Sequence, residues 1–114
     1  HQAACEAAAA VRMARTVGKA DDLEHWLFAN QPTMSPEKVR EGLKEVAGIA
    51  DFDARYATVI PAVKSDTALG ASLGVSSTPT FFINGVRIPG GINPRVLDYI
   101  IEYELGKAAT PAVQ

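Results

Sequence analysis

Hydrophobic positions in the first two thirds of the chain recur every three or four residues, whereas the stretch after residue 76 changes to a strand-like pattern. The first pattern is typical of helices with one buried face. It predicts helices over residues 2–17, 23–30, 36–47 and 51–73. Pro61 lies inside the last of these and removes a backbone donor, so we expect that segment to kink or restart there.

The first predicted helix is rich in alanine, the strongest helix former. Ala4, Ala7, Val11 and Ala14 fall on one stripe at helical spacing, and Gly18 is a plausible end. Because the stripe consists of small residues, we expect this helix to pack closely against a neighbour.

Local capping signals mark the starts of the next helices. Asp21 and Asp22 are expected to cap and charge the start of the second. Ser35-Pro36-Glu37 has the order of an N-cap, a first-turn proline and a first-turn acid. The inward face predicted for this third helix carries Val39, Leu43 and Val46, and Gly48 ends it.

Residues 80–83 and 86–88 are rich in β-formers and are separated by Asn84-Gly85. Asn-Gly between such runs predicts a β-hairpin with a type I′ turn. Phe81, Phe82 and Ile83 are apolar on both faces, as in a central strand. A lone hairpin is marginal in water, so we expect it to join a larger sheet or to be covered by helices.

Asn93-Pro94 predicts the start of a last helix, which Gly106 is expected to end. Its predicted inward face consists of Leu97, Ile100, Ile101 and Leu105. Residues 107–114 are expected to be a flexible tail.

The composition narrows the classes of function. A chain of 114 residues with 47% hydrophobic and 21% charged residues has the length and balance of one globular domain. A net charge of −2 gives no basic surplus for nucleic acid, and no uninterrupted apolar run predicts a membrane span. With one cysteine and two distant histidines, the sequence indicates no disulfide, cofactor or metal site. The chain begins with His1 and has no signal-peptide pattern, so we interpret it as a piece of a longer protein.

Three motifs together carry a resemblance to a known family. They are DTALGASLGVSSTPTFFING at residues 66–85, WLFANQ at residues 26–31 and Ser-Pro-Glu at residues 35–37. This combination resembles the bacterial DsbA-like thiol:disulfide oxidoreductases, over about residues 1–105. The resemblance implies an α/β, thioredoxin-like fold of the DsbA type.

The implied fold is incomplete. The family's first strand, its C-x-x-C helix and a second strand precede the residue that matches His1, and this sequence lacks them. We therefore expect a partial domain at residues 1–106. It would consist of a helical insertion (1–75), then the hairpin and last helix (76–106).

The resemblance implies a substrate-binding role for Ser77, Thr78 and Pro79. It places a cis peptide bond at Thr78-Pro79, which would turn the Thr78 N–H and C=O toward an extended substrate peptide. The alternative is that Pro79 simply begins a strand. Asp66 matches an acidic position of the family, for which a structural role is implied.

The implied function is part of a thiol:disulfide oxidoreductase domain, inactive alone because the dithiol is missing. Its partners would be protein or peptide thiols and disulfides. Its location would be an oxidising, extracytoplasmic one such as the periplasm or cell envelope. Whether the parent protein stands alone or is fused to a membrane oxidoreductase of the vitamin K epoxide reductase type stays open.

Two residues have a functional and an ordinary interpretation. Cys5 could be a reactive thiol, since it lies in the first turn of a helix and near Arg12. A lone cysteine without a resolving partner is more often a small packed apolar residue, and we favour that interpretation. His25 could shuttle protons, but a surface position is favoured. The aromatic residues could line a peptide groove, but most are expected to form the core.

An alternative function is a redox-inert module that binds a peptide or partner through the strand edge at the cis-proline. Since a sheet reduced to one hairpin leaves unpaired edges, we also expect a homodimer formed by sheet-edge pairing.

Overall fold

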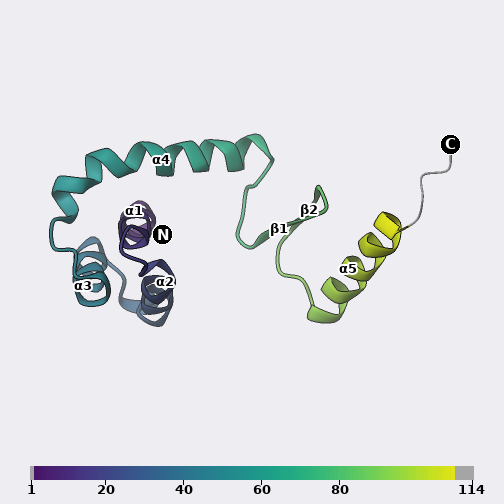
Figure 1. Cartoon of the computed structure of the whole chain (residues 1–114), viewed down its shortest axis with the longest axis horizontal. Helices are drawn as coiled ribbons and strands as arrows, with labels where there is room; N and C mark the ends of the chain where they lie inside the picture. Colours follow the sequence, from purple (N-terminus) through teal and green to yellow (C-terminus); the bar gives the residue numbers. More distant parts are fainter. Residues whose placement is uncertain (1, 110–114) are drawn as a thin grey trace. The chain divides into compact units, whose positions relative to one another are not determined.

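The computed structural model describes residues 2–109, which form helices and one two-stranded antiparallel sheet. The elements follow one another as α1 (Ala4–Arg15), α2 (Ala20–Ala29), a 3₁₀ turn (Gln31–Thr33), α3 (Pro36–Ala47), α4 (Phe52–Ser72), β1 (Thr80–Ile83), β2 (Val86–Pro89) and α5 (Pro94–Ala109) (Figure 1). They divide into two compact units, His1–Ala68 and Leu69–Gln114. The chain is thus a mixed protein in which helices predominate.

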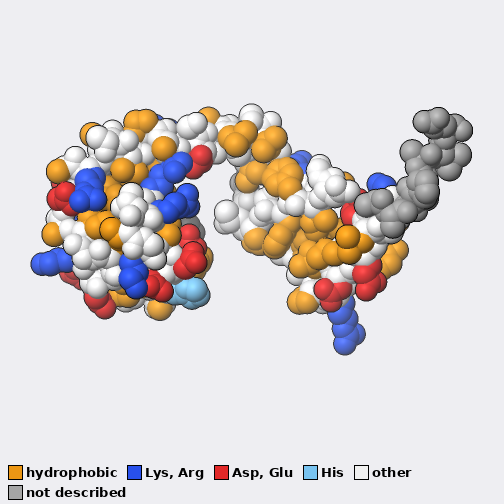
Figure 2. All heavy atoms as spheres, in the orientation of Figure 1, with side chains coloured by type: hydrophobic (Ala, Val, Ile, Leu, Met, Phe, Trp, Pro, Cys, Tyr) orange, Lys and Arg blue, Asp and Glu red, His pale blue; other side chains and the backbone are white. Residues whose placement is uncertain are grey.

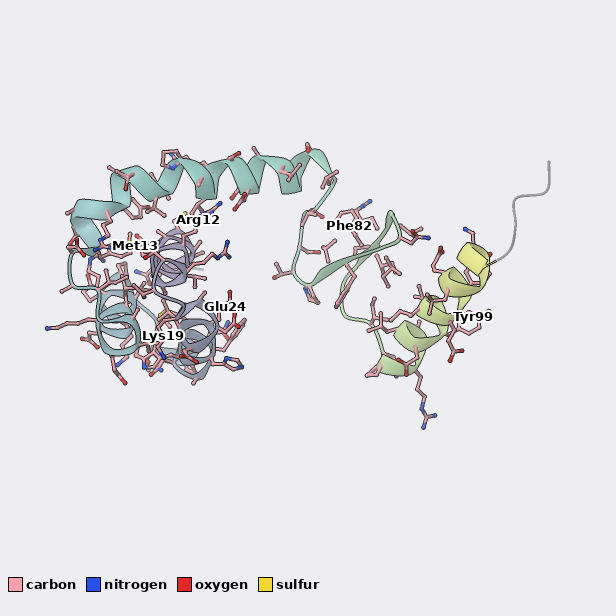
Figure 3. The ribbon with its side chains drawn as sticks, in the orientation of Figure 1. Arg12, Met13, Lys19, Glu24, Phe82 and Tyr99 are labelled. Atoms are coloured by element: carbon pink, nitrogen blue, oxygen red, sulfur yellow. The ribbon has the colours of Figure 1, made fainter. Side chains whose placement is uncertain are left out.

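The first unit contains the hydrophobic core, where α1, α2 and α3 pack against one another. The buried apolar side chains are Ala3, Ala9, Ala10, Met13, Ala14, Leu23, Val39, Leu43, Ile49 and Phe52. Four of these ten residues are alanines, namely Ala3, Ala9, Ala10 and Ala14. Because alanine side chains are small, the helices can approach one another closely. Met13, labelled in Figure 3 within this helical cluster, is the large side chain that α1 contributes.

The predicted face of α1 is only partly right. Ala14 is buried, but Ala7 and Val11 are half-buried and Ala4 is exposed. So many positions of this helix are alanine that hydrophobic periodicity does not distinguish its faces. The buried side includes Met13, which lies off the predicted stripe.

The ends of α3 agree with the prediction. The Lys38 N–H donates to Ser35 Oγ at 3.1 Å, and Gly48 ends the helix with φ +69°. The cap predicted for α2 is wrong. Its N-cap is Lys19, so Asp21 and Asp22 lie in the first turn, where they favour the helix through its dipole.

Helix α4 is continuous from Phe52 to Ser72, so it does not restart at Pro61. Proline removes one backbone donor, and the turns on either side retain enough hydrogen bonds to continue the helix. Gly74 then follows with φ +77°, as expected for the end of this segment.

Contacts with two other helices fix α4 in the first unit. Phe52 is buried, and the Arg40 guanidinium lies 4.6 Å from the centre of its ring. The same guanidinium donates to Asp53 Oδ1 at 2.6 Å. Further along α4, Asp66 accepts from Arg12 of α1 at 2.8 Å. Asp66 thus has a structural partner that the sequence did not predict.

The hairpin of the second unit has the predicted turn. Asn84 and Gly85 have φ +50° and +83°, the positive values that a type I′ turn requires at both central residues. Ile83 pairs with Val86 and Phe81 with Ile88. Because side chains alternate along a strand, Phe81, Ile83 and Ile88 share one face, and all three are half-buried.

Helix α5 begins as predicted, since Asn93 Oδ1 accepts from the Arg95 N–H at 2.9 Å. It continues past Gly106 to Ala109, so the predicted end at Gly106 is wrong. Residues 107–109 of the predicted tail are therefore helical, and residues 110–114 lie outside the described residues. Asn84 of the turn donates to Glu104 at 2.8 Å, which ties the helix to the hairpin.

The second unit differs from the first in burial. Among side chains 69–107, which the structure describes, none is buried. Ile101 and Leu105, predicted to face inward, are 41% and 64% exposed. On the face drawn in Figure 2, hydrophobic side chains gather over the hairpin and α5. The hairpin therefore covers only part of the apolar surface of α5.

One close approach in the first unit leads to a stability prediction. Gly42 of α3 is buried, and a Cβ atom added there would overlap the ring of Trp26 on α2. At Gly70 of α4, the nearest atom to an added Cβ is Val75 Cβ at 3.8 Å, an ordinary contact. The two helical glycines thus form a matched pair.

We expect Gly42→Ala to lower the free energy of unfolding by about 1–3 kcal/mol through overpacking. Gly70→Ala should raise it by at most about 1 kcal/mol, because alanine favours helix. Urea denaturation measured by circular dichroism tests both, and the fluorescence of the single tryptophan reports on the contact directly. Equal stability of the two variants would contradict the overlap.

The ion pair between α3 and α4 predicts a pH dependence. Hydrogen bonding to Arg40 lowers the pKa of Asp53, so this pair stabilises the fold while the carboxyl group is ionised. That contribution is present above about pH 4 and is lost as pH falls through the lowered pKa. We expect Asp53→Asn to lower the melting temperature at pH 7 and to leave it unchanged at about pH 2. Glu45→Gln, at an exposed α3 carboxylate with no ion pair among the described residues, is the control. A loss of equal size at both pH values would contradict this role.

Candidate functional site

The candidate site is the segment Ser77-Thr78-Pro79 that leads into β1. The Thr78-Pro79 peptide bond is cis, as the resemblance implied, and all three residues are exposed. Thr80 Oγ1 donates to the Ser77 carbonyl oxygen at 2.6 Å, and the Gly90 N–H donates to the Pro79 carbonyl oxygen at 2.9 Å. These bonds hold the segment on both sides of Thr78.

The backbone of Thr78 itself is open. Within residues 2–109, neither its N–H nor its C=O has a hydrogen-bond partner. The register of the hairpin explains this. Phe81 and Ile83 point their backbone groups at β2, and the Pro79 carbonyl oxygen also points there, where it accepts from Gly90. In an antiparallel ladder the alternate residues point the other way.

Three residues therefore present backbone donors and acceptors on the side away from β2. They are Thr78, Thr80 and Phe82, and the sheet contains no strand beyond β1 in the part that the structure describes. An edge of this kind can bind an extended chain by adding it as a further strand. The geometry suits a peptide backbone.

Cys5 lies in the first turn of α1, and its side chain is exposed. The favoured interpretation, a packed apolar residue, is wrong. The buried residues within α1 are Ala9, Ala10, Met13 and Ala14, all of which lie beyond the first turn that contains Cys5. Arg12 is paired with Asp66, so the expected neighbour of the thiol has a carboxylate partner.

Other candidate residues have ordinary surroundings. His25 is exposed, with Nδ1 2.8 Å from the Asp21 carbonyl oxygen, so the favoured surface position is confirmed. The expectation that most aromatic residues form the core is wrong. Of Trp26, Phe28, Phe52, Tyr56, Phe81 and Phe82, Phe52 alone is buried. Apart from Phe52, the buried core of the first unit consists of alanine, leucine, valine, isoleucine and methionine side chains.

Two kinds of structural feature are absent from the described residues. No group of three or more histidine, cysteine, aspartate or glutamate side chains among them is arranged to hold a metal ion. Across the same residues, no helix combines the length and the apolar character needed to cross a bilayer.

Comparison with known proteins adds no family. No protein-family model, no curated protein sequence and no solved structure matches this chain. The DsbA-like assignment thus stays a prediction from the sequence.

The exposure of Cys5 predicts its reactivity as a simple surface thiol. We expect one equivalent of Ellman's reagent to react with the native chain at a rate similar to that in denaturant, since access does not require unfolding. Cys5→Ser should abolish the signal. Reaction only after denaturation would show that the thiol is covered in solution.

Proposed function

We propose that this chain is the substrate-holding part of a DsbA-like thiol:disulfide oxidoreductase domain. The observation that carries the proposal is the exposed backbone of Thr78, unpaired among the described residues and continuous with the open edge of β1. An extended substrate would pair its own N–H and C=O with those of Thr78. Ser77 and Pro79 would fix that stretch in place.

The exchange chemistry needs two cysteines beside the held peptide. A thiolate attacks one sulfur of the substrate disulfide, a mixed disulfide forms, and the other substrate sulfur leaves as a thiolate. A second cysteine then attacks the mixed disulfide and releases the reduced substrate. This sequence holds only Cys5, so we assign the dithiol to a segment outside it. The parent protein would act in an oxidising, extracytoplasmic location.

The second unit supports a thioredoxin-like completion. Its hairpin has an open edge at β1, and α5 keeps apolar residues exposed on both sides of its half-buried strip. Further strands beyond β1 would widen the sheet beneath α5 and bury them. We infer that the hairpin and α5 are one end of a larger α/β sheet.

A second candidate function is a peptide- or partner-binding module without redox activity. Cys5 belongs to the first unit and Ser77-Thr78-Pro79 to the second, and the sequence has no other cysteine. With these residues alone, the chain can bind a peptide backbone but cannot complete a dithiol exchange.

The residues encoded directly upstream of His1 separate the two candidates. A strand followed by C-x-x-C supports the oxidoreductase, and the polypeptide that includes it should accelerate the reduction of insulin disulfides by dithiothreitol, which returns the polypeptide's own disulfide to the dithiol. The 114-residue chain and its Cys5→Ser variant should both stay at the buffer rate. If the chain turns insulin over and Cys5→Ser does not, Cys5 is a nucleophile and the substrate-holding role is wrong.

Binding is tested separately on the isotope-labelled chain. We expect an extended cysteine-containing peptide, and the same peptide with serine in its place, to shift amide resonances at residues 77–82. Resonances of α1, α2 and α3 should stay unchanged. Shifts confined to those helices would contradict both candidates.

A further inference from the structure

The two edges of the hairpin differ in their capacity to pair with another strand. On β2, Arg87 and Pro89 point their backbone groups away from β1, because Ile88 between them points its backbone groups toward β1. Pro89 has no N–H to donate. Arg87 places a charge at this edge, with Nη1 donating to the Gly74 carbonyl oxygen at 2.8 Å. Proline and charge are the usual means of protecting a sheet edge.

The edge of β1 has neither protection. Its outward residues Thr78, Thr80 and Phe82 each keep both an N–H and a C=O, and residues 76–83 carry no charge. Two copies of this edge would therefore meet without charge repulsion. When two such strands run antiparallel with Thr80 of one copy opposite Thr80 of the other, Thr78 of each copy lies opposite Phe82 of the other. Every outward backbone group then has a counterpart, so the edge is complementary to itself.

The second unit also leaves many apolar side chains in contact with water. Nine large side chains are 41–69% exposed, namely Leu69, Leu73, Phe82, Val86, Val96, Tyr99, Ile101, Tyr103 and Leu105. They are distributed over the end of α4, the hairpin and α5, and those beside β1 can be covered by a partner that pairs with this strand.

We propose that two copies of this chain associate through β1, antiparallel and about a two-fold axis at Thr80, to form a four-stranded sheet. The axis is perpendicular to the sheet, so both α5 helices lie on the same face, where an exposed side of each can be covered. Association needs no thiol chemistry, because it uses backbone pairing and apolar burial alone. It uses the same edge of β1 as the bound peptide and the further strands proposed above, so it forms only where that edge is free.

A charge-pair experiment on the whole chain tests this arrangement. Sedimentation equilibrium of the wild type should show the mass rising from 12.1 kDa to twice that value as concentration increases. Thr80→Lys places two ammonium groups opposite each other, and Thr80→Glu two carboxylates, so each variant should be monomeric. An equimolar mixture of the two should recover the dimer, which also shows that both variants fold.

Pro89→Lys is the matched control. Position 89 pairs with Thr80 within the hairpin, so this variant carries the same new charge on β2, one strand away from the proposed interface. It should dimerise as the wild type does. The proposal is overturned if the wild type stays at 12.1 kDa up to millimolar concentration. It is equally overturned if the Thr80 variants still dimerise singly, if their mixture stays monomeric, or if Pro89→Lys alone abolishes association.

Discussion

A two-stranded hairpin is too narrow to cover a helix that is apolar around most of its circumference, and this constraint determines the second unit. At 100° per residue, the apolar positions of α5 extend from Tyr99 through Ile100 to Leu105 over about two thirds of the helix. Two strands lie about 5 Å apart, whereas a helix with its side chains is about 10 Å wide. The hairpin therefore covers the middle of the arc, where Leu97 and Ile100 are half-buried. Both flanks remain in water, with Tyr99, labelled in Figure 3, on one of them.

In the first unit, small residues allow the helices to bury their apolar surface against one another. Ala9, Ala10 and Ala14 are completely buried, which lets α1 lie close to α2 and α3. Gly42 gives Trp26 a position against α3 that no larger residue would allow. Met13, Leu23 and Leu43 fill the remaining space between these helices and are also fully or almost fully buried. This unit consequently buries its own core, whereas the second depends on a further surface for burial.

Features fixed within a few residues could be predicted from the sequence. The Asn84-Gly85 turn, the Ser35 cap and the left-handed Gly48 each depend on local conformational preference, and the structure has all three. Features decided by packing could not. The buried side of α1, which includes Met13, depends on the helices that α1 packs against, and Cys5 is exposed in its first turn. Alanine at most positions gave no periodic signal to reveal either.

The candidate site lies between these two cases. Its residues could be identified from the Thr-Pro-Thr pattern, but the direction of their backbone groups depends on the register of β1 against β2. That register is itself set by the two-residue turn, since Ile83 and Val86 must pair directly across it. Counting back from the turn would therefore have predicted that Thr80 and Phe82 point outward. The missing information was whether another strand lies beyond them.

The same backbone groups are required by each proposed occupant of the edge. A bound peptide would use the N–H and C=O of Thr78, and β1 of a second copy would use those of Thr78, Thr80 and Phe82. These donors and acceptors can form only one ladder at a time, so the two modes exclude each other. A second copy also offers apolar burial beside α5, which a short peptide does not. Peptide binding therefore competes with self-association, and its apparent affinity falls as the concentration of the chain rises.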